Sequence, residues 1–97
     1  MTPYHVSNPA LADLEEIWSY FAAEVGDINL AERMNKDFFE AFRNISCSPG
    51  IGHTRSDLAP KKFRFYSTNS FLIVYQLTSD TLEIVRVIHA ARDFPNL

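Results

Sequence analysis

The chain has 97 residues, of which 46% are hydrophobic and 22% are charged. This composition is ordinary for one globular domain and excludes disordered and collagen-like proteins. The formal net charge is −3. Residues 1–50 hold eight acidic and three basic residues, whereas residues 51–97 hold four acidic and six basic ones. The two halves therefore offer opposite charge to their partners.

Cysteine content and hydropathy indicate the cellular compartment that we expect for this protein. The single cysteine, Cys47, excludes an internal disulfide and a cysteine-based zinc site, and it fits a reducing compartment. No apolar stretch reaches the roughly 20 residues that a membrane-spanning helix needs. We therefore expect a cytoplasmic protein that forms a single domain over residues 1–97 and makes no contact with a membrane.

The first half of the chain predicts a short strand followed by two helices. Residues 4–7 form the strand, and Asn8–Pro9 begins a helix, because asparagine caps free amides and proline at the first helical position loses no hydrogen bond. Gly26 ends this helix, and Asp27 caps a second helix over residues 28–45. Apolar residues three or four positions apart are expected to face the core: Leu11, Leu14, Ile17, Trp18, Phe21 and Val25, then Leu30, Met34, Phe38, Ala41, Phe42 and Ile45. The short connection folds the two helices into an antiparallel hairpin.

Three strands follow, over residues 62–67, 71–77 and 82–89. The links at 68–70 and 78–81 are short and polar, as in tight β-turns, so the strands form an antiparallel meander. The order is β-α-α-β-β-β. It predicts an α+β domain in which a helical hairpin packs on one face of a twisted antiparallel sheet.

The middle strand is apolar on both of its faces. Ile73 and Tyr75 point to one side, and Leu72 and Val74 point to the other. A single hairpin covers one face only, so the second face is expected to stay exposed and to bind a partner. Dimerisation is the alternative explanation. Either Leu72 with Val74 or Ile73 with Tyr75 forms the partner-facing set.

The residues offer few sites for cofactor or metal chemistry. Gly50 and Gly52 lack the strand and spacing of a nucleotide-binding loop. The histidines His5, His53 and His89 show no metal-ligand spacing. We predict no cofactor and no metal.

The most polar strand end is the segment 86–93, Arg-Val-Ile-His-Ala-Ala-Arg-Asp. Arginines beside a histidine and an aspartate can bind phosphates or transfer protons. A structural role is the alternative, in which Arg92 and Asp93 tie the chain end to the sheet and His89 is a satisfied edge residue.

The chain resembles the RelE/ParE superfamily of bacterial type II toxins over nearly its whole length. The resemblance rests on the order of elements and on four segments: Ala-Asp-Leu-Glu-Glu-Ile at 12–17, Ser48–Pro49 with Gly52 and Arg55, Phe-Leu-Ile-Val-Tyr at 71–75, and 84–93 ending in His-Ala-Ala-Arg-Asp. The last of these segments is most similar to the ParE branch.

The resemblance implies two possible activities. Members of the RelE branch cleave messenger RNA in the ribosome with basic residues on the strand after the helices, an arginine on the next strand, an arginine after the last strand and a tyrosine in the tail. Arg92 matches the late arginine, and Lys62 and Arg64 offer the basic strand. Leu72 stands in place of the second-strand arginine, and the chain ends at Leu97, short of the tyrosine. The studied members of the ParE branch poison DNA gyrase without known catalytic chemistry. The absence of the second-strand arginine and of the tail tyrosine fits this branch better.

The leading hypothesis is thus a ParE-like, non-enzymatic toxin that binds DNA gyrase and is neutralised by a cognate antitoxin. Its expected target-binding residues are Arg64, Arg86, His89, Arg92 and Asp93. Direct nucleic-acid binding is expected only in a complex with the antitoxin. The alternative from another class is a ribosome-dependent endoribonuclease that uses Lys62, Arg64, His89 and Arg92. A third possibility is a member without toxicity.

Overall fold

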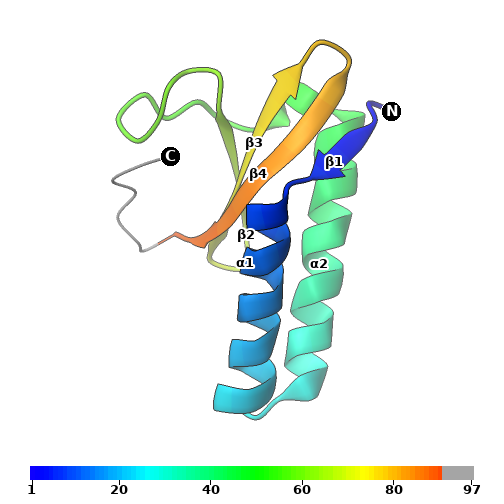
Figure 1. Cartoon of the computed structure of the whole chain (residues 1–97), viewed down its shortest axis with the longest axis vertical. Helices are drawn as coiled ribbons and strands as arrows, with labels where there is room; N and C mark the ends of the chain where they lie inside the picture. The colour runs from blue at the N-terminus through cyan, green and yellow to red at the C-terminus, as the bar shows by residue number, and fades with distance from the viewer. Residues whose placement is uncertain (91–97) are drawn as a thin grey trace.

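Two helices pack side by side against one face of a four-stranded sheet in the computed structural model, which describes residues 1–90 (Figure 1). The elements in chain order are β1 (Tyr4–Val6), α1 (Asn8–Ser19), the π-helix η1 (Tyr20–Glu24), α2 (Ile28–Cys47), the 3-10 turn η2 (Pro49–Ile51), β2 (Arg64–Thr68), β3 (Phe71–Thr78) and β4 (Thr81–His89). Within the described part, no helix combines the length and hydrophobicity needed to cross a bilayer.

The predicted α+β class and element order are confirmed, but the sheet is mixed rather than wholly antiparallel. Its strand order is β1-β4-β3-β2. The last three strands form the expected meander, whereas β1 runs parallel to β4 with Tyr4 opposite Leu82. The direction of a hairpin strand is fixed by its turn, but β1 is followed by two helices, so no local signal sets its direction.

The ends of the helices follow the predicted capping chemistry with one shift. Asp27 caps α2 by accepting a hydrogen bond from the Leu30 amide at 2.9 Å, as predicted. The cap of α1 is Ser7 rather than Asn8, because the Ser7 hydroxyl accepts from the Ala10 amide and also donates to the Val85 carbonyl on β4. The same hydroxyl thus caps the helix and attaches it to the sheet.

The larger core cluster lies between the hairpin and the sheet. From the helices it contains Ala10, Leu14, Met34, Phe38, Ala41, Phe42 and Ile45, and from the sheet Phe71, Ile73, Tyr75, Leu82, Ile84 and Val87. The stripe predicted for α2 faces this core. The stripe predicted for α1 is only partly correct, because Leu11, Trp18 and Val25 are exposed. The sheet and α2 cover a narrower strip of α1 than its apolar residues occupy.

A second cluster covers the opposite face of the sheet and corrects the expectation that this face is exposed. Leu72 and Val74 are 8% and 0% exposed. They pack with Phe65 and Ile88 against residues of the loop that precedes β2, namely Leu58, Ala59 and Phe63. Burial of this apolar surface stabilises the fold. The loop therefore does within the chain what a partner was expected to do.

A candidate partner-binding groove between the hairpin and the last strand

The described part of the chain contains an apolar groove of about 520 Å³. It lies between the hairpin and the ends of β3 and β4 that carry Phe71 and His89. Its lining residues, which define the helix–strand groove, are Asp13, Glu16, Ile17, Tyr20, Phe21, Val25, Phe71, Val87, Ile88 and His89. Its volume lies in the range of typical ligand sites, and its walls are mostly aromatic and aliphatic.

The π-helical turn shapes the helical wall of this groove. The Val25 amide donates to the Tyr20 carbonyl, a bond that spans five residues instead of four. Tyr20 and Phe21 stack edge to face with ring centroids 5.1 Å apart. Tyr20 and Val25 are 54% and 49% exposed although they are apolar groove residues. Exposed apolar side chains gathered in a concave site are typical of a surface that binds a partner.

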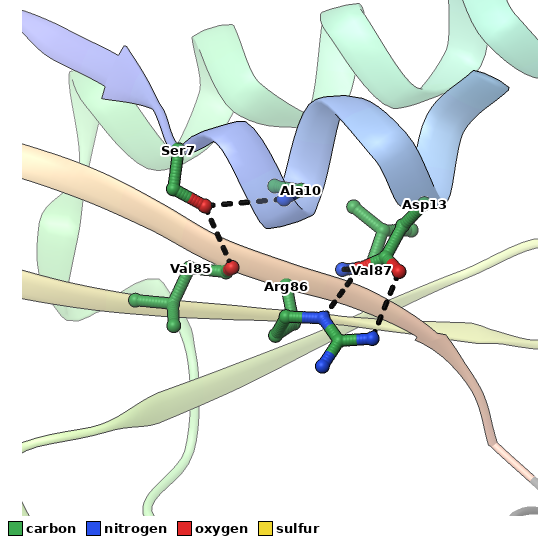
Figure 2. A network of polar contacts seen from close by, with 6 residues as sticks. All are labelled: Ser7, Ala10, Asp13, Val85, Arg86 and Val87. Carbon is green, nitrogen blue, oxygen red and sulfur yellow. Dashed lines mark hydrogen bonds and ion pairs between the residues drawn. The ribbon is translucent and has the colours of Figure 1, made fainter.

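Polar contacts between α1 and β4 hold the other wall in place (Figure 2). β1 pairs with β4 only as far as Ile84, so the edge of β4 beyond that residue needs other hydrogen-bond partners. The Asp13 carboxylate accepts from the Val87 amide at 2.9 Å. It also accepts from the Arg86 guanidinium at 2.7 and 2.9 Å. One aspartate on α1 thereby fixes both the strand edge and the arginine beside it.

The charged groups at the groove are acidic or internally paired. The hydrogen bond from Arg86 to Asp13 raises the pKa of the Arg86 guanidinium, which therefore stays protonated at any physiological pH. The negative charge of Glu16, which lines the groove, also raises the pKa of the Arg86 guanidinium. The groove is thus apolar with an acidic margin on its α1 side.

A second polar cluster fixes the chain where α2 gives way to the loop. The buried Tyr75 hydroxyl donates to the Pro49 carbonyl at 2.7 Å and accepts from the Gly52 amide at 2.8 Å. Burial raises the pKa of this phenol. Arg64 donates to the Gly52 carbonyl at 2.9 Å, and His53 pairs with Phe65 as a β-bridge. These contacts anchor the start of the loop that covers the second cluster.

The residues predicted for target contact are not gathered at one place. Arg86 is paired with Asp13 at the α1 side of β4, and Arg64 is bound to the loop after α2. His89 is exposed, lines the helix–strand groove and stacks edge to face on Phe71 at 5.2 Å. Lys62 is exposed, with its ammonium over the Phe63 ring. Arg92 and Asp93 lie outside the described residues.

Strand register separates the basic residues that the ribonuclease alternative combines. Arg64 lies opposite Tyr75, whereas His89 lies opposite Phe71 in the row of Thr68. Four residues therefore separate Arg64 from this row, which is about 13 Å along the strand. The two side chains therefore start far apart on the sheet, and the Arg64 guanidinium is already bound to the Gly52 carbonyl.

The structure also decides which sheet face the hairpin covers. Ile73 and Tyr75 face the hairpin, and Leu72 and Val74 face the loop. Both candidate antitoxin-binding sets are therefore buried within this chain. Exposed apolar residues also lie on the groove wall, at Tyr20 and at Val25, which the sequence predicted to face the core.

Metal ligands do not gather among residues 1–90, where no three histidine, cysteine, aspartate or glutamate side chains come close enough to share an ion. The exposed apolar side chains of the groove support partner binding as its function.

Comparison with known proteins identifies the family of this chain. A family model described as "ParE toxin of type II toxin-antitoxin system, parDE" matches residues 4–94. The chain belongs to the ParE toxin family. Toxin ParE1 of Caulobacter vibrioides is 29% identical over 89 residues, which cover 92% of this chain and 90% of that toxin. The predicted resemblance to the ParE branch is thereby confirmed.

The fold itself has a solved counterpart. A structure titled "Chromosomal ParDE TA system from P. aeruginosa" superimposes with a TM-score of 0.78 and covers 92% of this chain and 96% of its own. The sequence identity is 19%. This comparison therefore establishes the shared fold, but it does not assign roles to single residues. The chain is therefore a ParE-type toxin of a toxin–antitoxin system with the α+β fold of its family.

Proposed function

We propose that this ParE-type toxin inhibits DNA gyrase and that a cognate antitoxin neutralises it by occupying the helix–strand groove. Membership of the ParE family supports the toxin role. The choice of gyrase inhibition over RNA cleavage rests on one observation above all, which is the residue that stands in place of the second-strand arginine of the RelE branch.

That residue is Leu72, and its buried side chain is not accessible to a substrate. Its side chain is 8% exposed and packs in the second cluster with Ala59 and Phe63. Cleavage of RNA by an in-line mechanism develops negative charge on phosphate oxygens, and preformed cationic donors stabilise that charge. An aliphatic side chain under a loop supplies no such donor. The distance between Arg64 and His89 along the sheet supports the same choice.

The helix–strand groove supports the antitoxin as its occupant. It is an apolar hollow in which an aromatic or aliphatic anchor of the antitoxin would be desolvated, and such anchors dominate binding energies. The loop before β2 carries the exposed bases Lys61 and Lys62, and also Arg55, which is paired with Asp57. An acidic antitoxin segment beside that loop would associate faster. Since His89 lines the groove, an antitoxin seated there covers a residue proposed for target contact.

The groove assignment is tested with two matched substitutions. Val25 and Ile28 are similarly exposed, at 49% and 55%, but only Val25 lines the groove. Val25→Asp should weaken binding to the antitoxin of the neighbouring gene at least tenfold in calorimetry, and Ile28→Asp should change it less than twofold. Equal effects of the two substitutions would show that the antitoxin binds elsewhere.

Gyrase inhibition is tested by induction in growing cells. The proposal predicts DNA breaks that depend on gyrase, an SOS response and arrested growth, all suppressed when the antitoxin is expressed with the toxin. Codon-specific cuts in translated messages, mapped by primer extension, would instead establish the ribonuclease alternative. Normal growth with neither signal, at a verified level of folded protein, would identify a member without toxicity.

A further inference from the structure

The helix–strand groove contains one carboxylate that the fold does not neutralise. Asp13 and Glu16 both line the groove. The Asp13 carboxylate already accepts three hydrogen bonds, two from the Arg86 guanidinium and one from the Val87 amide. Among residues 1–90, by contrast, no hydrogen bond or ion pair involves the Glu16 carboxylate. Glu16 therefore keeps its capacity to bind a cation.

The surroundings of Glu16 decide what an occupant of the groove has to supply. Ile17, Tyr20 and Val87 line the same groove, so a side chain that fills it takes water away from the Glu16 carboxylate. Removing water from a carboxylate is strongly unfavourable unless an opposite charge and new hydrogen bonds replace that water. An occupant that binds tightly must therefore place a basic side chain beside its apolar one.

Tyr20 offers a second contact for the same cation. The Tyr20 amide donates to the Glu16 carbonyl, so the two residues are one helical turn apart and lie on the same face. Both line the groove. An aromatic face attracts cations, arginine more often than lysine. The planar guanidinium of arginine can also donate two parallel hydrogen bonds to a carboxylate. A carboxylate next to an exposed tyrosine ring thus favours arginine over lysine.

The shape and charge of the groove disfavour a second copy of this chain as the occupant. A two-fold interface brings the same patch of both copies together, so groove would face groove and Glu16 would face Glu16. Two facing hollows do not reach the packing density of a stable interface, and two facing carboxylates repel each other. The occupant is therefore a different protein with a protruding apolar side chain.

We propose that Glu16 and Tyr20 form a recognition site for one arginine of the antitoxin, beside the apolar side chain that fills the groove. The inference rests on the proposed function, in which the antitoxin occupies this groove. An antitoxin with a neutral or acidic residue at this position would leave the Glu16 carboxylate buried and unpaired, so the site selects between antitoxins.

The first test measures binding of the full chain to the antitoxin of the neighbouring gene by calorimetry. Glu16→Gln, which removes the charge, should weaken binding about threefold to tenfold, and Glu16→Lys should weaken it by more than about tenfold. The matched control is Glu15→Gln, because Glu15 is the adjacent exposed acid on α1 and does not line the groove. This control should change the affinity less than about twofold.

A second comparison tests the contact with the tyrosine ring. Tyr20→Leu should weaken binding at least about threefold more than Tyr20→Phe, because only phenylalanine keeps an aromatic face for the cation. Equal losses for the two variants would show that no cation stacks on this ring.

Charge reversal on both proteins tests the choice of arginine. Each arginine and lysine of the antitoxin is changed to glutamate in turn and measured against Glu16→Lys. One arginine variant should recover at least about tenfold in affinity, because it restores opposite charges across the contact. Recovery only with a lysine variant, or with none, would overturn the assignment.

The outcomes separate this inference from the proposed function. If Val25→Asp weakens binding and the Glu16 variants do not, the inference is wrong and the groove remains the antitoxin site. If none of these variants weakens binding, both proposals for the groove fall. Tighter binding by Glu16→Gln would show that the antitoxin buries this carboxylate without a cation, and would overturn the inference.

Two further results would assign the site to another occupant and so overturn the inference. One is a Glu16→Lys variant that binds the antitoxin normally but no longer inhibits gyrase. The other is an unaltered dimer that Glu16→Lys converts to a monomer. Circular dichroism checks that each variant folds. If Glu16→Lys does not fold, Glu16→Gln decides, because it keeps the size of an exposed side chain.

Discussion

The attachment of α1 to β4 through Asp13 predicts a specific pattern of stability losses. Asp13→Ala removes the ion pair with Arg86 and the acceptor of the Val87 amide. The Arg86 side chain is 37% exposed, so its ion pair is partly screened by water and contributes about 1 kcal/mol. A buried amide left without an acceptor costs about 1–3 kcal/mol. The substitution should therefore lower the free energy of unfolding by about 2–4 kcal/mol.

A double-mutant cycle separates these two contributions. Arg86→Ala removes the ion pair but leaves the bond from Val87 to Asp13, so the coupling between Asp13 and Arg86 should be about 1 kcal/mol. The double variant should remain less stable than the unaltered chain by at least about 1 kcal/mol, because the Val87 amide still lacks its acceptor. Urea unfolding followed by circular dichroism measures all four proteins. Glu15→Ala, an exposed acid on the same helix, is the control and should change stability by less than about 0.5 kcal/mol.

Two results would refute this reasoning. A loss for Asp13→Ala no larger than that for Glu15→Ala would show that the three hydrogen bonds to Asp13 do not hold the helix to the strand. A double variant as stable as the unaltered chain would show that the Val87 amide finds another acceptor at no cost.

Other predictions concern the loop anchor and a helix cap. Gly52→Ala should destabilise the fold by about 2 kcal/mol or more in urea unfolding, because the added Cβ would lie 2.5 Å from the Tyr75 hydroxyl and 3.0 Å from a backbone oxygen; a neutral result would refute the close packing. Tyr75→Phe should cost about 1–2 kcal/mol at neutral pH. Because burial raises the pKa of Tyr75 above its ordinary 10.0, the folded state keeps this proton after the unfolded chain has lost it. Stability should then fall as pH rises above 10.0, less steeply in Tyr75→Phe, and equal slopes in denaturation curves from pH 9 to 11 would contradict the assignment. Asp27→Ala should cost about 1 kcal/mol of thermal stability through the lost α2 cap, and an unchanged melting temperature would contradict it.

Local patterns explain why so much of the fold could be predicted from the sequence. The stripe from Met34 to Ile45 has helical spacing, and Asp27 caps the helix that carries it, so α2 was defined by nearby residues. The turns at 69–70 and 79–80 likewise fix the meander. The parallel direction of β1 depends on pairing with a strand nearly 80 residues away in the sequence, and no local signal encodes it.

The candidate sites were harder to predict because they depend on what the rest of the chain leaves uncovered. Leu72 with Val74 was one of two candidate partner-facing sets, and the loop around Ala59 covers it. Trp18 looked buried because its spacing matched the core stripe, yet it is exposed. The π-helical bond between Val25 and Tyr20, which shapes the groove wall, has no clear sequence signature. Arg86 was expected to contact a target, but its partner Asp13 lies 73 residues away in the sequence.

The central claim is that this ParE-type toxin acts on gyrase rather than on RNA. The most direct measurement adds the purified chain to DNA gyrase with relaxed plasmid, and in parallel to ribosomes translating a defined message. The account predicts inhibited supercoiling and trapped linear plasmid, both reversed by the antitoxin, and an intact message. Unaffected supercoiling together with cuts in the message at defined codons would contradict it.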